Sequence, residues 1–142
     1  MEARGVQGMT NNPLSDIKQY SNAMTISQTL KFCEKKGLGI TRGMIQNYIR
    51  DGLLPSPANK RFYTHKHMAA LVLIDRLKTV FDIPTIHAAL TPLMDEEGLP
   101  MEVYNKLIKD SLAILERFKQ EGNYNRLTLM AFLSFAKADV LN

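Results

Sequence analysis

The sequence of 142 residues contains no tryptophan and a single cysteine, Cys33. One thiol cannot form a disulfide within its own chain, so the disulfide-stapled scaffolds of small secreted proteins are excluded. This cysteine usage indicates a reducing compartment, and we expect a cytoplasmic protein. Cys33 falls on the apolar side of an expected helix, which predicts a buried structural thiol rather than a metal ligand.

Long hydrophobic runs are also absent. The densest apolar stretch, residues 127–136, contains a threonine and a serine and is too short to span a bilayer. The first residues carry Glu2 and Arg4 without an apolar run, so they do not resemble a secretory signal. We therefore expect no membrane partner.

The residue patterns of enzymes and metal sites are missing too. There is no glycine-rich phosphate loop and no nucleophile–base pair, and residues 95–97 (Asp-Glu-Glu) indicate an acidic linker. His65 and His67 are two residues apart and do not share a helical face, while His87 stands alone. No zinc-type spacing occurs. We predict that the chain has no catalytic activity, metal or cofactor.

Positive charge is concentrated in the middle of the chain. Residues 31–78 hold ten lysines and arginines against three acidic residues. Residues 1–30 are balanced, and residues 79–142 carry six basic and nine acidic side chains. The basic middle indicates a polyanion as partner, although such an excess can also be spread over a solvated surface. The spacing of the cations has to decide between the two.

Two short helices are predicted around a glycine turn in this basic region. Thr25 and Gln28 form a capping box that opens the first helix. Residues 37–39, Gly-Leu-Gly, end it with a tight turn, and Thr41 caps a second helix that runs to Gly52. Two helices joined in this way are typical of the helix-turn-helix.

The second helix is expected to have two distinct faces. Ile45, Tyr48 and Ile49 share the apolar face, and we favour a core position for Tyr48 over a DNA contact. The other face is polar. It consists of Arg42, Gly43, Gln46, Asn47 and Arg50.

A basic hairpin should follow. Pro55 and Pro57 exclude a helix, and the sequence Arg-Phe-Tyr favours extended backbone, so residues 53–63 predict a short hairpin, or wing. Thr64 then caps a long helix, and Asp82 opens a short one. The apolar stripe of the long helix is formed by Ala70, Leu73, Ile74, Leu77 and Phe81.

Duplex DNA is the polyanion that this arrangement fits best. Gln46 and Asn47 each offer a donor beside an acceptor, the pairing that adenine accepts in the major groove. Arg42 and Arg50 would extend the same face toward guanine or phosphate. Phosphate contacts are expected from Lys60, Arg61 and Lys66. Each residue alone is ordinary on a solvated surface, so the hypothesis depends on their joint placement on one helix and the adjoining hairpin.

Residues 41–55 (TRGMIQNYIRDGLLP), followed by Lys60-Arg61-Phe62-Tyr63 and an apolar helix, resemble the DNA-binding half of MerR-type transcription regulators. The closer likeness is to a MerR-like family of uncharacterised proteins from Gram-positive bacteria. It covers residues 25–91. The resemblance implies a winged helix-turn-helix that binds a palindromic promoter as a dimer, with Arg61 as the wing arginine on phosphate and Tyr48 as the recognition-helix tyrosine.

The sequence departs from the MerR pattern at two positions of the recognition helix. Gly43 stands where an arginine is usual, and Asn47 stands where a second aromatic residue is frequent. A different operator sequence or weaker binding would follow. The second wing is also absent or reduced, because Pro84 follows the long helix closely.

The fold class expected is therefore mainly α, a winged helix-turn-helix followed by a C-terminal helical dimerisation hairpin. Residues 1–24 are expected to be a flexible leader with a docked turn near Ile17 and Tyr20. Residues 25–94 would form the DNA-binding domain, and residues 95–142 a helical pair.

The C-terminal pair is expected to form a homodimer seam, because the last helix is apolar almost all round. The seam would contain Met101, Tyr104, Ile108, Leu115, Phe118, Leu129, Phe132 and Leu133. The alternative is that these residues pack over Leu73 and Leu77 of their own chain. An apolar pocket for an unidentified effector could also lie between these helices.

The function predicted is a sequence-specific, DNA-binding transcription regulator that acts on double-stranded DNA as a dimer. The alternative is a protein-interaction adaptor that keeps a MerR-like fold without strong DNA binding. The departures at Gly43 and Asn47 favour that alternative. The operator, the regulated genes and the sign of regulation cannot be derived from the sequence.

Overall fold

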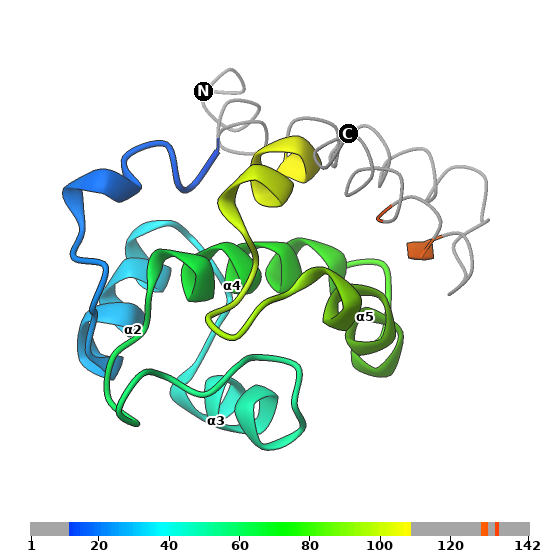
Figure 1. Cartoon of the computed structure of the whole chain (residues 1–142), viewed down its shortest axis with the longest axis horizontal. Helices are drawn as coiled ribbons and strands as arrows, with labels where there is room; N and C mark the ends of the chain where they lie inside the picture. Colours follow the sequence, from blue (N-terminus) through cyan, green and yellow to red (C-terminus); the bar gives the residue numbers. More distant parts are fainter. Residues whose placement is uncertain (1–11, 109–128, 131–132, 134–142) are drawn as a thin grey trace.

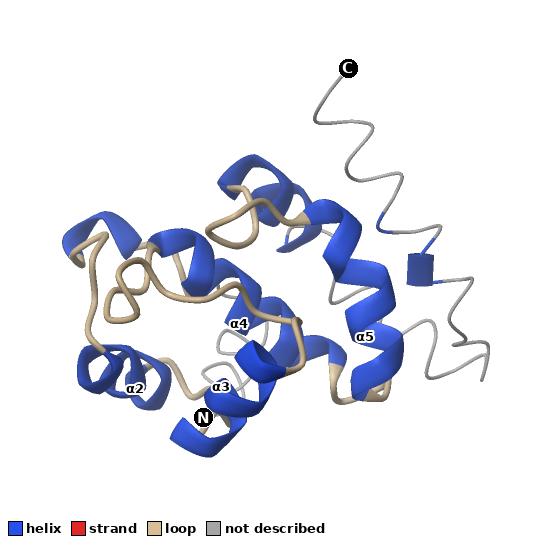
Figure 2. Cartoon of the chain, turned by 60° about the horizontal axis from the view of Figure 1, so that its bottom comes forward, coloured by secondary structure: helices blue, strands red, loops and turns tan. Residues whose placement is uncertain are grey.

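The computed structural model describes residues 12–108, 129–130 and 133. The described part is mainly helical, and its elements are arranged around one long helix, α4 (His65–Leu77) (Figure 1). Helices α2 (Ile26–Lys35), α3 (Arg42–Arg50) and α5 (Ile83–Leu90) surround α4 and are joined by loops (Figure 2). The 3-10 helices η1 (Ile17–Gln19) and η2 (Thr91–Leu93) lie in the flanking segments.

The helices begin at the caps that the sequence predicts. Thr25 and Gln28 form the reciprocal capping box of α2, and Thr41 accepts a hydrogen bond from the Met44 backbone N–H at 3.2 Å. The Asp82 carboxylate accepts from the Thr85 N–H at 2.8 Å at the start of α5. The predicted helix starts are therefore confirmed. Each cap stabilises its helix because it satisfies an otherwise free backbone N–H group.

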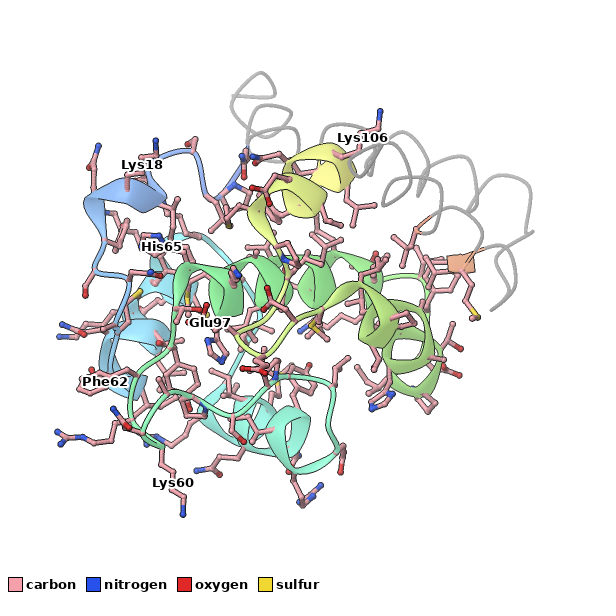
Figure 3. All side chains as sticks on the ribbon, viewed as in Figure 1. Lys18, Lys60, Phe62, His65, Glu97 and Lys106 are labelled. Carbon is pink, nitrogen blue, oxygen red and sulfur yellow. The ribbon has the colours of Figure 1, made fainter. Side chains whose placement is uncertain are left out.

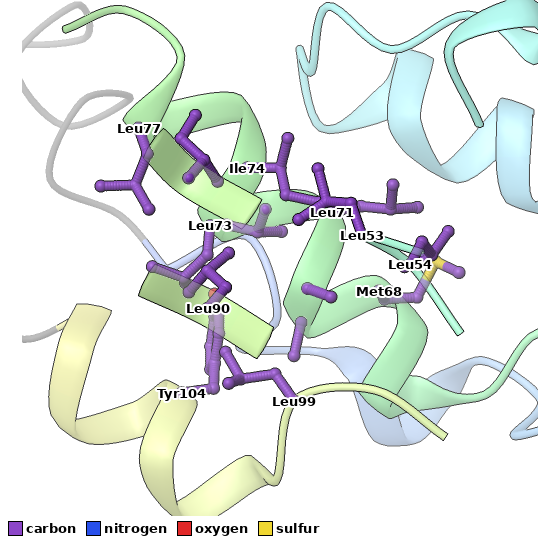
Figure 4. Packing of buried hydrophobic residues seen from close by; sticks show 14 of the residues in the cluster. Leu53, Leu54, Met68, Leu71, Leu73, Ile74, Leu77, Leu90, Leu99 and Tyr104 are labelled. Atoms are coloured by element: carbon purple, nitrogen blue, oxygen red, sulfur yellow. The ribbon is translucent and has the colours of Figure 1, made fainter. Parts of the chain in front are cut away.

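The core is centred on α4. The predicted stripe is buried, but the burial extends further, because every residue from His67 to Ile74 is inaccessible to solvent or nearly so. Figure 4 shows α4 side chains in contact with apolar residues from the loop after α3, from α5 and from the 99–107 region. A helix covered on all sides fixes the positions of the elements around it.

The segment that precedes α2 belongs to this core. Leu14, Ile17 and Met24 are buried, and Met24 pairs with Tyr63 through two backbone hydrogen bonds of 2.7 and 2.8 Å. The expectation of a flexible leader is therefore wrong for residues 12–24. The docked turn near Ile17 is present as η1. Widely spaced apolar residues, without helical periodicity, concealed this packing in the sequence.

The C-terminal residues that the structure describes pack against their own chain. Residues 101–108 are helical, and the side chains buried within the chain are Val103, Tyr104 and Leu107, of which the predicted seam contains only Tyr104. The Tyr104 hydroxyl donates a hydrogen bond to the Asn12 side chain.

Some side chains of the predicted dimer seam are thus already covered. Tyr104, Leu129 and Leu133 are at most 1% exposed within the single chain, which matches the intramolecular alternative. Met101 and Ile108 are partly buried. Leu115, Phe118 and Phe132 lie outside the described residues.

None of the helices in the described ranges combines the length and the apolar content that crossing a membrane requires.

Candidate nucleic-acid interface

Helix α3 presents a polar face to solvent. Ile45 and Tyr48 are buried, with exposures of 0% and 6%, and they attach the helix to the core. Tyr48 is therefore a core residue, the position favoured from the sequence over the DNA contact that the MerR resemblance implies. The side chains left exposed are those of Arg42, Gln46, Asn47 and Arg50, which we call the α3 face. Arg50 approaches Asp51 at 3.3 Å, but both side chains are more than half exposed, so this pair is weak.

The turn between α2 and α3 is held by two residues at the C-terminal end of α4, Asp75 and the C-cap Lys78. The Asp75 carboxylate accepts from the Gly39 N–H at 3.0 Å, and the Lys78 ammonium donates to the Gly39 carbonyl at 2.6 Å. Asp75 and Lys78 also form an ion pair of 3.3 Å along one side of α4. Because this clamp holds both backbone polar groups of Gly39, it restrains the orientation in which α3 leaves the turn. Sequence reasoning missed both residues, since their partner lies more than thirty positions away.

The segment after α3 folds into a tight antiparallel hairpin, residues 57–62, which we call the basic hairpin. Ala58 and Phe62 form an isolated bridge, and Asn59 and Lys60 both have positive φ, at 54° and 60°. Two left-handed residues in succession make the type I′ geometry that suits a twisted hairpin. Lysine rarely adopts this conformation, so the turn is strained. Lys60 and Arg61 are exposed, and Figure 3 shows Lys60 projecting from the lower edge of the molecule.

The base of the basic hairpin interacts electrostatically with the start of α3. Burial raises the pKa of Tyr63, and the positive charge of Arg42 partly opposes that rise. The α3 face and the basic hairpin both present exposed cations to solvent. Lysines 31 and 35 on α2 are exposed as well.

A buried histidine joins α4 to the segment between α3 and the basic hairpin. The His67 Nδ1 accepts from the Thr64 N–H at 2.9 Å, so Nε2 carries the proton and donates to the Pro55 carbonyl at 3.1 Å. This completes a capping box in which histidine takes the place usually held by glutamate or glutamine. Desolvation lowers the pKa of His67 and keeps the ring neutral. The spacing Thr64-x-x-His67 was the sequence signal that could have identified this capping box.

Lys66, predicted as a phosphate contact, forms ion pairs within its own chain. Its ammonium lies 2.6 Å from Asp95 and 3.7 Å from Glu97, and the hydrogen bond to Asp95 raises its pKa. These carboxylates compete with any phosphate, so we leave Lys66 out of the interface. The acidic residues 95–97 reach Lys66 because Gly98 brings its loop against α4, where Leu99 donates to the Lys66 carbonyl at 3.1 Å.

Residues 13–107 match a family described as a domain of unknown function (DUF1836). The chain belongs to this family. No curated protein and no solved structure matches the chain. These comparisons carry no link to MerR-type regulators, so that resemblance stays a prediction.

The limits of the DUF1836 match agree with the packing. The match begins at residue 13, where the segment leading to α2 joins the core, and ends at Leu107, a buried residue. The 25–94 domain that the sequence predicted is therefore shorter at both ends than the matched region.

The core also contains the one cysteine of the chain, Cys33. Burial raises the pKa of Cys33 to about 12, so its thiol stays protonated and unreactive at neutral pH. Among residues 12–108, histidine, cysteine and carboxylate side chains do not gather in threes around a point that could hold a metal ion.

Proposed function

We propose that this chain is a sequence-specific transcription regulator of the MerR-like, winged helix-turn-helix type that binds duplex DNA. The observation that carries the proposal is the joint exposure of the α3 face and the cations of the basic hairpin. The α3 face carries amides able to read bases, the basic hairpin carries cations able to hold phosphates, and Ile45 and Tyr48 bury the opposite side of α3.

The dimensions of α3 suit the major groove. Its nine residues extend about 14 Å at 1.5 Å per residue, and the groove is about 12 Å wide. Gln46 and Asn47 would read adenine by paired hydrogen bonds. Arg42 and Arg50 would meet guanine or phosphate at the two ends of the helix. Lys60 and Arg61 would hold the flanking backbone and fix the register.

Base readout is tested with Gln46→Ala and Asn47→Ala, after a binding-site selection with the full chain has supplied a specific duplex. Fluorescence anisotropy should show that each change lowers the preference for that duplex over random DNA by about 1–3 kcal/mol. Affinity for random DNA should hardly change. Gln19→Ala, which removes an exposed amide outside α3, should leave the preference intact. If both α3 variants discriminate as the parent does, the assignment of these residues is wrong.

Phosphate binding is tested by the salt dependence of the affinity. Arg61→Ala should weaken binding to every sequence and reduce the slope of log K against log salt by about one. Lys18→Gln removes an exposed cation from η1 and should leave the slope unchanged. Little affinity and no salt slope in the parent chain would overturn DNA binding and favour the protein-interaction adaptor.

We also propose that two copies bind together. The support is the partial exposure of apolar side chains at Met101, Ile108 and Met130, in the C-terminal part of the described chain. Sedimentation analysis should show a dimer in the parent and a larger monomer fraction in Ile108→Glu. A parent that sediments as a monomer, both free and on the selected duplex, would refute this.

A further inference from the structure

A groove of about 320 Å³ lies between the outer side of α2 and the segment 19–24 that precedes it. Figure 1 shows this segment running alongside α2. Tyr20 is half-buried in its wall and meets Phe32 edge-to-face, with 5.1 Å between ring centroids. Met24 and Phe32 form the buried base. The groove is thus aromatic and apolar inside.

Two cations border this apolar interior. Lys31 and Lys35 line the groove and are exposed, and neither forms an ion pair with another described residue. The Lys35 ammonium lies 5.9 Å from the centre of the Tyr20 ring. Lys36, by contrast, is held by Asp16 at 2.6 Å, which leaves Lys31 and Lys35 as the cations available to a ligand. A flat apolar wall beside ammonium groups that form no ion pair is suited to a molecule that has both an apolar body and an anionic group.

We propose that this groove binds a small organic anion with a flat apolar body. The body would lie against Tyr20 and the methylene stems of the lysines, and the anionic group would meet Lys31 and Lys35. A DNA backbone fits less well, because it offers negative charge but no apolar body to fill the groove.

The wall of the groove is bonded to the base of the basic hairpin. Met24 and Tyr63 exchange two backbone hydrogen bonds, the His65 Nε2 lies 2.8 Å from the Tyr20 carbonyl, and the His65 N–H donates to Asn22 at 2.7 Å. A ligand that orders residues 20–24 therefore also orders residues 63–65, where the hairpin meets α4. Regulation of DNA binding through this connection rests on the proposed function, whereas ligand binding itself does not.

The test uses 2-naphthoate and its neutral counterpart 2-naphthamide, titrated by calorimetry into the full chain without DNA. We expect saturable one-to-one binding of the acid, and the double variant K31Q/K35Q should weaken it by about tenfold or more. The amide should bind the parent and the double variant equally and more weakly. Lys18→Gln, with the same charge change outside the groove, should bind the acid as the parent does.

Several results would overturn the proposal. The first is the absence of saturable binding of 2-naphthoate, and the second is equal affinity of the parent and the double variant for it. The third is an equal loss of affinity in Lys18→Gln, which would indicate general charge attraction. If the double variant loses duplex affinity but keeps its affinity for the acid, the two lysines serve DNA phosphates instead. Because the titration contains no DNA, failure of the proposed function would leave its outcome unaffected.

The connection to the hairpin has its own readout. Amide hydrogen exchange at Met24 and Tyr63 should slow when 2-naphthoate is bound, because both N–H groups take part in the bridge between groove and hairpin. Exchange at the Ile45 amide, inside α3, serves as the reference. Binding without a change at Met24 and Tyr63 would show that the groove and the hairpin are independent.

Discussion

At the scale of single residues, His67 shows how one side chain can serve two elements. Its exposure is 1%, both ring nitrogens are engaged, and the Tyr63 ring lies edge-on at 5.4 Å. Protonation would force Nδ1 to give up the Thr64 N–H and would place a charge where water cannot reach it. Desolvation lowers the pKa of His67 more than the Pro55 carbonyl and the nearby carboxylates of Glu97 and Asp95 raise it.

We therefore predict that the fold loses stability in mild acid. In the unfolded chain His67 titrates near its ordinary value of 6.5, whereas the folded chain resists protonation. The unfolded state then binds more protons as the pH falls, and the free energy of unfolding should drop by up to about 1.4 kcal/mol between pH 7.5 and 5.5. Urea denaturation at several pH values measures this.

His67→Gln provides the control, because glutamine completes the same capping box and stays neutral. Its stability should change less over the same pH range. An unchanged pH dependence in this variant would assign the effect to other groups.

At the scale of elements, the basic hairpin holds Lys60 at a fixed position although its backbone conformation lowers stability. Lys60 has φ of 60°, a conformation that costs a non-glycine residue about 1 kcal/mol. The strain persists because the Ala58–Phe62 bridge and the Met24–Tyr63 bridge hold both ends of the turn. The outcome is a cation at the tip of a short, fixed projection.

Lys60→Gly should accordingly raise the free energy of unfolding by about 0.5–1 kcal/mol and, on the proposed function, lower DNA affinity at the same time. Lys60→Asn is the matched variant, since asparagine tolerates left-handed backbone but carries no charge. Both substitutions should reduce the slope of log K against log salt concentration by about one. Thermal denaturation and anisotropy titrations measure the two effects, and a less stable Lys60→Gly would contradict the strain argument.

At the scale of the whole molecule, Gly98 joins the region after α5 to the central helix. A Cβ atom at this position would lie 2.4 Å from the Lys66 carbonyl oxygen and 2.9 Å from the His67 nitrogen, and φ is +136°. Backbone atoms cannot move aside as a flexible side chain can. We predict that Gly98→Ala lowers the free energy of unfolding by about 3 kcal/mol or more. It should also break the ion pair between Lys66 and Asp95.

Gly43→Ala is the control within α3. Its Cβ would approach no heavy atom more closely than the Thr41 hydroxyl, at 4.0 Å, and alanine favours a helix by about 1 kcal/mol over glycine. Chemical denaturation should therefore show opposite effects for the two substitutions. Similar stabilities for both would mean that the Gly98 loop is not held against α4 as described.

The sequence predicted the parts of the fold that depend on neighbouring residues. Caps at Thr25, Thr41, Thr64 and Asp82 act within three positions, so composition and spacing reveal them. The exposure of Gln46 and Asn47 follows from helical periodicity in the same way.

The missed features depend on distant partners. Asp75 meets Gly39, Lys66 meets Asp95, and Met24 meets Tyr63 only once the chain has folded. No pattern of neighbouring residues in the sequence indicates these pairs. This is why the leader was expected to be flexible, and why Lys66 was assigned to phosphate.

Helix α3 has a buried side and an exposed side, and this division affects how its sequence can vary among related proteins. Ile45 and Tyr48 hold the helix in place, while the side chains of the α3 face touch little of the protein and can be exchanged at small cost in stability. On the proposed function, one scaffold would then bind many different nucleotide sequences after a few substitutions in the α3 face. Transplanting those four side chains from another member of the family should transfer its target preference together with them.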